Sequence, residues 1–86
     1  MIAFIVGEME IKDEARDALR ALPDDIRQQI GYRLHLLQQE ISGDLKKLKG
    51  SKNEYRLRVG NYRVLFELEG KRIVVYAIGP RKDIYQ

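Results

Sequence analysis

The feature of the sequence that most constrains its fold is a series of three strand-like segments joined by two short glycine links. The segments are EYRLRV (54–59), YRVLFELE (62–69) and RIVVYAIG (72–79), and the links are Gly60-Asn61 and Gly70-Lys71. A two-residue link that begins with glycine is a common β-hairpin turn, because glycine readily takes a positive φ at the first turn position. We therefore predict an antiparallel three-stranded meander.

The turns also determine which side chains share a face of this meander. If each link is the whole turn, residues directly opposite one another lie on the same face. One face then carries no charge and consists of Tyr55, Leu57, Val59, Tyr62, Val64, Phe66, Leu68, Ile73, Val75 and Ala77. The other, which we call the arginine face, carries Arg56, Arg58, Arg63, Leu65, Glu67, Val74, Tyr76 and Ile78. A slip of one residue would bury arginines, so the pattern fixes the register.

The first half of the chain predicts elements that cover the apolar face. Residues 2–11 have a strand pattern, with Met9 and Ile11 facing inward. Apolar residues then recur at helical spacing in two stripes on either side of Pro23, namely Ala15, Ala18, Leu19 and Leu22, and Ile26, Ile30, Leu34, Leu37 and Ile41. We predict one α+β domain over residues 1–86, in which an N-terminal strand and a helical hairpin precede the meander and the helices pack on one face of the sheet.

Composition narrows the possible functions. The chain has no cysteine, which excludes disulfides and cysteine-based metal sites and makes the cytoplasm the expected location. The apolar run Ile2–Val6 is far too short to span a membrane. Residues 1–43 hold five basic and eight acidic residues, whereas residues 44–86 hold eleven basic and five acidic ones. This polarity favours an anionic ligand or partner for the second half, such as nucleic acid, an acidic protein segment or a membrane surface.

The arginine face is the candidate site. Arg58 is predicted to lie directly opposite Arg63, and opposed like charges destabilise a sheet by about 0.2–1 kcal/mol. Arg56 lies two positions along the same strand, and Arg81 follows the last strand. A phosphodiester would compensate such a cluster well, because each guanidinium offers a planar fork of donors to phosphate oxygens.

Several neighbouring residues fit the same interpretation. Tyr76 or Tyr85 can stack on a base, with Leu65 and Ile78 as an apolar floor beside Tyr76. Exposed lysines precede the sheet in a stretch that we interpret as a solvated loop able to steer a polyanion, namely Lys46, Lys47, Lys49 and Lys52. A solvated polar sheet face, or a surface for an acidic protein partner, would accommodate the same charges.

Other residues give weaker signals. His35, the only histidine, is predicted on the surface of the second helix rather than in a catalytic role. Glu67 is expected to pair with an arginine of its own face. No Ser/His/Asp set, phosphate-binding loop or metal-ligand cluster is recognisable in the sequence.

Two segments, LKGSKNEYRLRVGNYRVLFEL (48–68) and VVYAIGPRKDIY (74–85), resemble the RelE/ParE toxin superfamily of bacterial toxin–antitoxin systems, and its RelE branch in particular. The resemblance covers the whole chain. It implies an mRNA interferase that enters the A site of the 30S ribosomal subunit, cleaves the mRNA there and halts translation. It also implies a cognate RelB-like antitoxin that wraps the toxin. No cofactor, metal, membrane or direct contact of the toxin alone with DNA is expected.

The functional positions of the family correspond to individual residues of this chain. The resemblance implies a catalytic set of Arg56, Arg58, Arg63, Arg81 and Tyr85. We expect RNA contacts from Lys46, Lys47, Lys49, Lys52, Lys82 and Tyr76. Some relatives have lysine at the positions of Arg56 and Arg58, and many have histidine where this chain has Pro80. Because arginine does not readily lose its proton, Tyr85 is the expected proton acceptor.

Two other functions remain open on the same fold. A ParE-like toxin would inhibit DNA gyrase, and an inactive member would act only as a binding module. The basic set together with Tyr85 favours cleavage of RNA, because a gyrase inhibitor does not need these residues.

Overall fold

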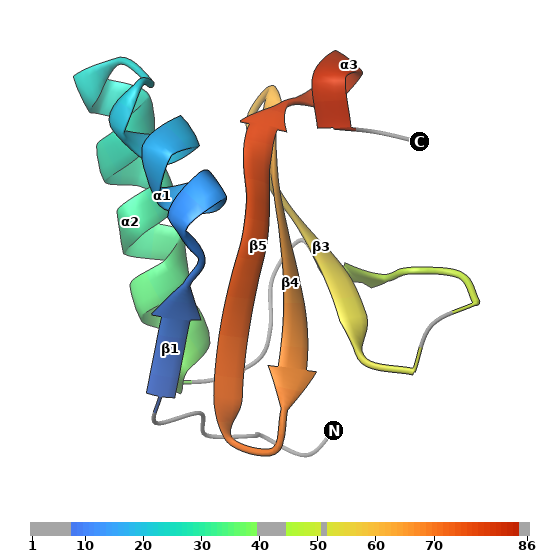
Figure 1. The fold of residues 1–86 in the computed structure, drawn as a ribbon. Helices are drawn as coiled ribbons and strands as arrows, with labels where there is room; N and C mark the ends of the chain where they lie inside the picture. Colours follow the sequence, from blue (N-terminus) through green and yellow to red (C-terminus); the bar gives the residue numbers. More distant parts are fainter. Residues whose placement is uncertain (1–7, 40–44, 51, 85–86) are drawn as a thin grey trace.

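Five strands form one mixed sheet in the part of the chain that the computed structural model describes, residues 8–39, 45–50 and 52–84 (Figure 1). Along the chain, the elements are β1 (Glu8–Ile11), α1 (Asp13–Arg20), α2 (Asp24–Gln39), β2 (Leu45–Lys47), β3 (Glu54–Val59), β4 (Tyr62–Glu69), β5 (Arg72–Pro80) and α3 (Arg81–Ile84). The strands are ordered β1-β5-β4-β3-β2 in the sheet. The α+β class predicted from the sequence is confirmed.

The predicted meander is present as β3, β4 and β5. Arg58 lies opposite Arg63 in the antiparallel β3–β4 pair, as expected. Gly60 has a φ of 60° and Gly70 a φ of 59°, while no described non-glycine residue has a positive φ. A positive φ at the first central residue alone is the signature of a type II′ turn, whose twist matches that of the strands it joins.

The predicted register of the β4–β5 pair is correct near the second turn and wrong beyond it. Phe66 lies opposite Val75 as predicted, but a register shift follows, so that Leu65 pairs with Ala77 and Val64 with Ile78. The shift leaves Tyr76 as the extra residue of a β-bulge. Ile78 is therefore in the core and 6% exposed. The predictions that Ile78 lies on the arginine face and Ala77 on the apolar face are wrong.

The bulge has an energetic reason. Isoleucine has three more carbon atoms than alanine, and each buried CH₂ contributes about 0.8 kcal/mol. Exchanging Ala77 for Ile78 on the covered face therefore stabilises the fold by about 2 kcal/mol. The small side chain of Ala77 is left half-buried on the other face.

The two edge strands differ from expectation in different ways. β1 pairs with β5 in parallel, with Met9 beside Ile73 and both packed in or against the core. The remainder of the strand predicted at 2–11, residues 2–7, lies outside the described residues. β2 was not predicted, because three residues carry too little pattern. It places Lys46 opposite Arg56, so interpreting Lys46 and Lys47 as part of a loop is wrong.

Both predicted helices are confirmed, and they lie together on one side of the sheet (Figure 1). Their stripes pack on the apolar face, and the buried core comprises Ala15, Ile30, Leu34, Leu37, Leu57, Val59, Val64, Phe66, Ile73, Val75 and Ile78. Ile41, predicted to extend the second stripe, lies outside the described residues. Within the described ranges, no helix is long and apolar enough to cross a membrane.

Candidate functional site

The strand register arranges the arginine face in rows that cross the sheet. The row nearest the β3–β4 turn contains Arg58, Arg63 and Gly79, and the next contains Lys46, Arg56, Leu65 and Ala77. The two remaining rows contain Glu54, Glu67, Val74 and Glu10, and then Glu69, Arg72 and Glu8. One end of this face is therefore basic and the other mainly acidic.

Arg63 is the most buried charged residue among those described, with 7% of its surface exposed. Its Nη1 donates hydrogen bonds to the carbonyl oxygens of Gly60 and Tyr62, both at 2.9 Å. These bonds compensate for part of the cost of removing the charge from water. Both use the same nitrogen, so Nε and Nη2 retain donor capacity for another acceptor.

Three other arginines lie close enough to Arg63 to affect its charge. Burial lowers the pKa of the Arg63 guanidinium, and repulsion from Arg81, Arg56 and Arg58 lowers it further. We call Arg56, Arg58, Arg63 and Arg81 the basic cluster. Arginine remains charged at neutral pH, so this repulsion is a cost of the fold that a bound anion would relieve.

Arg81 is the one member of the basic cluster that does not lie on a strand of the meander. It is the first residue of α3, which lies at the end of β5 (Figure 1). Its backbone N–H donates to the carbonyl oxygen of Asn61 at 2.9 Å, which joins α3 to the β3–β4 turn. The side chains of Arg81 and Lys82 are exposed. Tyr85, the predicted proton acceptor, lies outside the described residues.

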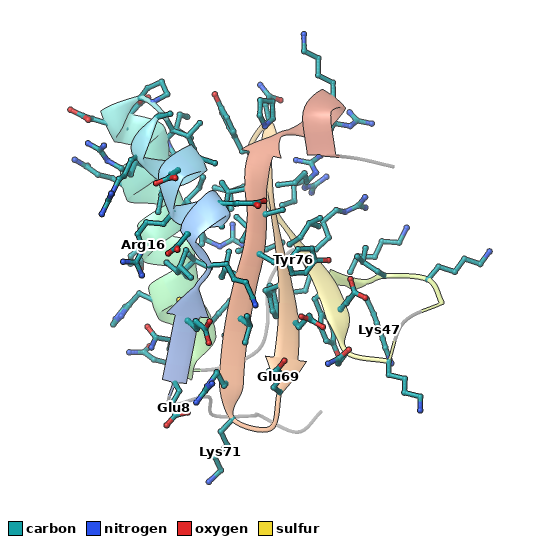
Figure 2. All side chains as sticks on the ribbon, in the orientation of Figure 1. Glu8, Arg16, Lys47, Glu69, Lys71 and Tyr76 are labelled. Carbon is teal, nitrogen blue, oxygen red and sulfur yellow. The ribbon has the colours of Figure 1, made fainter. Side chains whose placement is uncertain are left out.

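Tyr76 lies in the middle of the arginine face, between the acidic and basic ends (Figure 2). Its hydroxyl donates to Oε1 of Glu54 at 2.6 Å. The pKa of Tyr76 is raised by burial, by this hydrogen bond and by the negative charges of Glu54 and Glu67. Tyr76 is therefore a neutral phenol and cannot serve as a base near neutral pH, while the aromatic ring remains able to contact a ligand. No pattern in the sequence indicated this bond, which joins β5 to β3 across β4.

The remaining predicted residues have simple positions. All four predicted lysines are exposed, with Lys46 and Lys47 in the outer strand β2 and Lys49 and Lys52 in the segment that follows it. His35 is exposed on α2, and its Nε2 lies 3.5 Å from Nε2 of Gln39, which confirms the prediction of a helix-surface residue.

Glu67 does not pair with an arginine of its face, and that prediction is wrong. Glu67 lies opposite Glu54, and the ion pairs that Asp24, Glu8 and Glu10 form with arginines in the described part of the chain do not include it. The register places Glu67 in the same row as Glu54 and Glu10, one row away from Arg56 and two rows away from Arg58 and Arg63.

Sequence comparison assigns most of the chain to a known group. Residues 9–85 match the family model described as the ParE toxin of the type II toxin–antitoxin system parDE. The chain is also 38% identical over 72 residues to Toxin RelE3 of Methanocaldococcus jannaschii, a match that covers 78% of this chain and 82% of that protein.

Solved structures share the fold. The toxin–antitoxin complex RelB-RelE from Methanococcus jannaschii contains a chain that is similar with a TM-score of 0.78 and 32% identity, covering 88% of this chain and 94% of that one. The archaeal RelE-RelB complex from Pyrococcus horikoshii gives a TM-score of 0.78 at 26% identity, covering 90% and 97% of the two chains.

Proposed function

Because this chain belongs to the RelE/ParE superfamily of toxins from type II toxin–antitoxin systems, we propose that it is a RelE-type endoribonuclease that cleaves mRNA in the ribosomal A site. Its similarity to Toxin RelE3 and to RelE chains of solved complexes favours the RelE branch. In this proposal the protein inhibits translation, requires no metal or cofactor and acts in the cytoplasm.

The observation that carries this proposal is the basic cluster. Arg63 is buried and lies close enough to three other arginines for their charges to lower its pKa, and its bonds to the turn leave Nε and Nη2 with donor capacity. An mRNA phosphate would meet several guanidinium groups that the fold has already brought together. Donors that are in place before reaction stabilise the charge that develops in the transition state, which is commonly the largest contribution to catalysis.

The proposed chemistry is an internal transesterification of RNA. The 2′-oxygen attacks the adjacent phosphorus while the bond from phosphorus to the 5′-oxygen breaks, leaving a 2′,3′-cyclic phosphate and a 5′-hydroxyl. Arg56, Arg58 and Arg63 hold the phosphate and stabilise its added charge. Arg81 stabilises the departing 5′-oxygen, which takes a proton from a neighbouring water.

In this proposal Tyr85 is the base that accepts the proton of the 2′-hydroxyl. Nearby cations favour the phenolate form of a tyrosine, and Tyr76 is unsuitable because its pKa is raised and its hydroxyl already binds Glu54. Lys46, Lys47, Lys49, Lys52 and Lys82 would contact the RNA backbone away from the scissile phosphate.

A cognate antitoxin of the RelB type is the proposed protein partner. The structural relatives from two archaea are described as complexes of RelE with RelB. An antitoxin segment rich in carboxylates would compete with RNA for the basic cluster.

Mapping the cut ends on ribosome-bound mRNA tests the proposal. We expect breaks within the A-site codon that carry a cyclic phosphate and a 5′-hydroxyl, and no cleavage of the same mRNA without ribosomes. Absence of cleavage on every programmed ribosome would overturn the proposal.

The second candidate is inhibition of DNA gyrase, which the description of the matching family model as a ParE toxin favours. Measuring protein synthesis and DNA supercoiling in the same expressing cells separates the two. Translation falls first if the chain cleaves mRNA, and supercoiling falls first if it inhibits gyrase.

A further inference from the structure

Three consecutive carbonyl oxygens of the β3–β4 turn accept hydrogen bonds from two arginines of the basic cluster. Gly60 and Tyr62 accept from Nη1 of Arg63, each at 2.9 Å. Asn61, between them, accepts from the backbone N–H of Arg81, also at 2.9 Å. One turn therefore holds both the buried guanidinium and the first residue of α3.

These bonds oppose the electrostatic repulsion between Arg63 and Arg81, which would otherwise move the two residues apart. Arg63 experiences the positive charges of Arg81, Arg56 and Arg58. Only 7% of Arg63 is exposed, so water screens this repulsion weakly. Carbonyl oxygens carry partial negative charge, so the turn attracts the guanidinium that the other arginines repel.

We propose that the Gly60–Tyr62 turn is the positioning element of the site, which fixes Arg63 and the start of α3 so that Arg63 and Arg81 meet the same phosphate. This assignment rests on the proposed cleavage of RNA. Gly60 is its key positioning residue, because its φ of 60° is a conformation that L side chains rarely adopt. The turn touches no substrate and acts through the arginines that it holds.

The second turn of the meander provides a matched control. Gly70 has a φ of 59°, and it also begins a two-residue turn. An ideal Cβ on either glycine would meet no other atom within 4 Å, so alanine strains both turns through the backbone alone. The second turn lies at the acidic end of the sheet, and the carbonyl of Lys71 accepts from the backbone N–H of Glu8.

The experiment compares Gly60→Ala with Gly70→Ala on ribosomes programmed with a cleavable mRNA, using single-turnover rates at saturating toxin together with the affinity for the ribosome. We expect both variants to lose similar stability and to bind within about threefold of wild type. Gly60→Ala should cleave at least about tenfold more slowly at saturation, and Gly70→Ala within about twofold of wild type. Equal rates for the two variants would overturn the assignment.

A combined variant separates positioning from general loss of stability. If the turn acts through Arg63 and Arg81, adding Gly60→Ala to a chain that already carries Arg63→Ala and Arg81→Ala lowers the remaining rate by less than about threefold, because residues that act as a unit are not additive. Losses that multiply in full would contradict the proposal. A wild-type chain that cuts no programmed ribosome would instead overturn the proposed function, and this assignment with it.

A second pair of variants applies if Gly60→Ala does not fold. Asn61→Gly loosens the first turn and Lys71→Gly the second, and glycine fits any turn conformation. We expect a loss of at least about fivefold in cleavage for Asn61→Gly only. Equal rates in this pair would again overturn the positioning role.

Discussion

The hydroxyl of Tyr76 donates a 2.6 Å hydrogen bond to the carboxylate of Glu54, two strands away across β4. This bond lies where the acidic and basic ends of the arginine face meet. It joins the bulged residue of β5 to the first residue of β3. The bond therefore has consequences for stability that can be separated from catalysis.

Tyr76→Phe removes this bond while keeping the ring. We expect a loss of about 1–2 kcal/mol in the free energy of unfolding, since Glu54 is half-buried and loses a hydrogen-bond donor. Urea denaturation measures the change. Tyr32→Phe is the control, because Tyr32 is 62% exposed, and its stability should match wild type. Unchanged stability of Tyr76→Phe would mean that water replaces the bond at no cost.

The same bond predicts a pH dependence. The pKa of Tyr76 is raised in the folded state, so the folded chain keeps a proton that the unfolded chain releases above its ordinary pKa of about 10. The stability that Tyr76 adds over Tyr76→Phe is therefore complete below about pH 10 and declines as the pH rises further. Unfolding both proteins between pH 8 and about 11.5 tests this. A difference in the free energy of unfolding between the two proteins that stays constant or grows at high pH would contradict this prediction.

Arg81→Ala should abolish most cleavage without harming the fold. The side chain is exposed, and the bond to Asn61 uses the backbone N–H, which alanine retains. Loss of one group that stabilises transition-state charge costs about 10²–10³ in rate, which a programmed-ribosome assay measures. Arg72→Ala is the matched control, because Arg72 lies at the acidic end of the sheet beside Glu8 and Glu10. Equal losses for both variants would refute a specific role for Arg81.

Anions should stabilise the protein through the basic cluster. If sulfate binds with a Kd of about 1 mM, a concentration of 10 mM adds about 1.4 kcal/mol, which corresponds to a rise in Tm of about 5–11 °C for a chain of this size. Thermal denaturation in sulfate and in chloride of equal ionic strength measures the effect. The rise should be smaller in Arg81→Ala and unaltered in Arg72→Ala. An equal rise in all three proteins would indicate that sulfate acts through the solvent.

The bulge at Tyr76 can be tested by comparing the free energy of unfolding of two variants, each with one side chain shortened to alanine. Ile78→Ala should lose about 2–4 kcal/mol, because Ile78 is buried in the core. Leu65→Ala should lose about 1 kcal/mol, because Leu65 is half-exposed on the arginine face. Denaturant unfolding of both variants provides the comparison. A loss for Ile78→Ala no larger than that for Leu65→Ala would point to the unshifted register, in which both residues lie on the arginine face.

The meander was predictable because its alternation and turn glycines agree with one another. Arg58 opposite Arg63 follows from counting residues away from Gly60-Asn61. The bulge was not predictable by counting, because it depends on whether Ile78 or Ala77 fills the space beneath α1 and α2, and that space exists only in the folded chain.

The candidate site was predictable to a similar extent. Residue order on the strands indicated Arg56, Arg58 and Arg63, and the sequence also suggested Arg81 as a neighbour. The carbonyl groups that bind Arg63 belong to the backbone, which every residue has, so the sequence could not indicate that these hydrogen bonds form. The partnership of Glu54 with Tyr76 likewise depends on β3 and β5 lying on either side of β4.

The parallel pairing of β1 with β5 has a consequence for how this chain is made. Glu8 of β1 can pair only after Arg72 has been synthesised, 64 residues further along the chain. A ribosome that adds 5–20 residues per second needs about 3–13 s to synthesise that stretch. Until β5 emerges, β1 and β4 have no strand between them, and much of the apolar surface of the helices stays uncovered. The nascent toxin therefore completes its sheet only near the end of synthesis. Its toxic activity is delayed until that point.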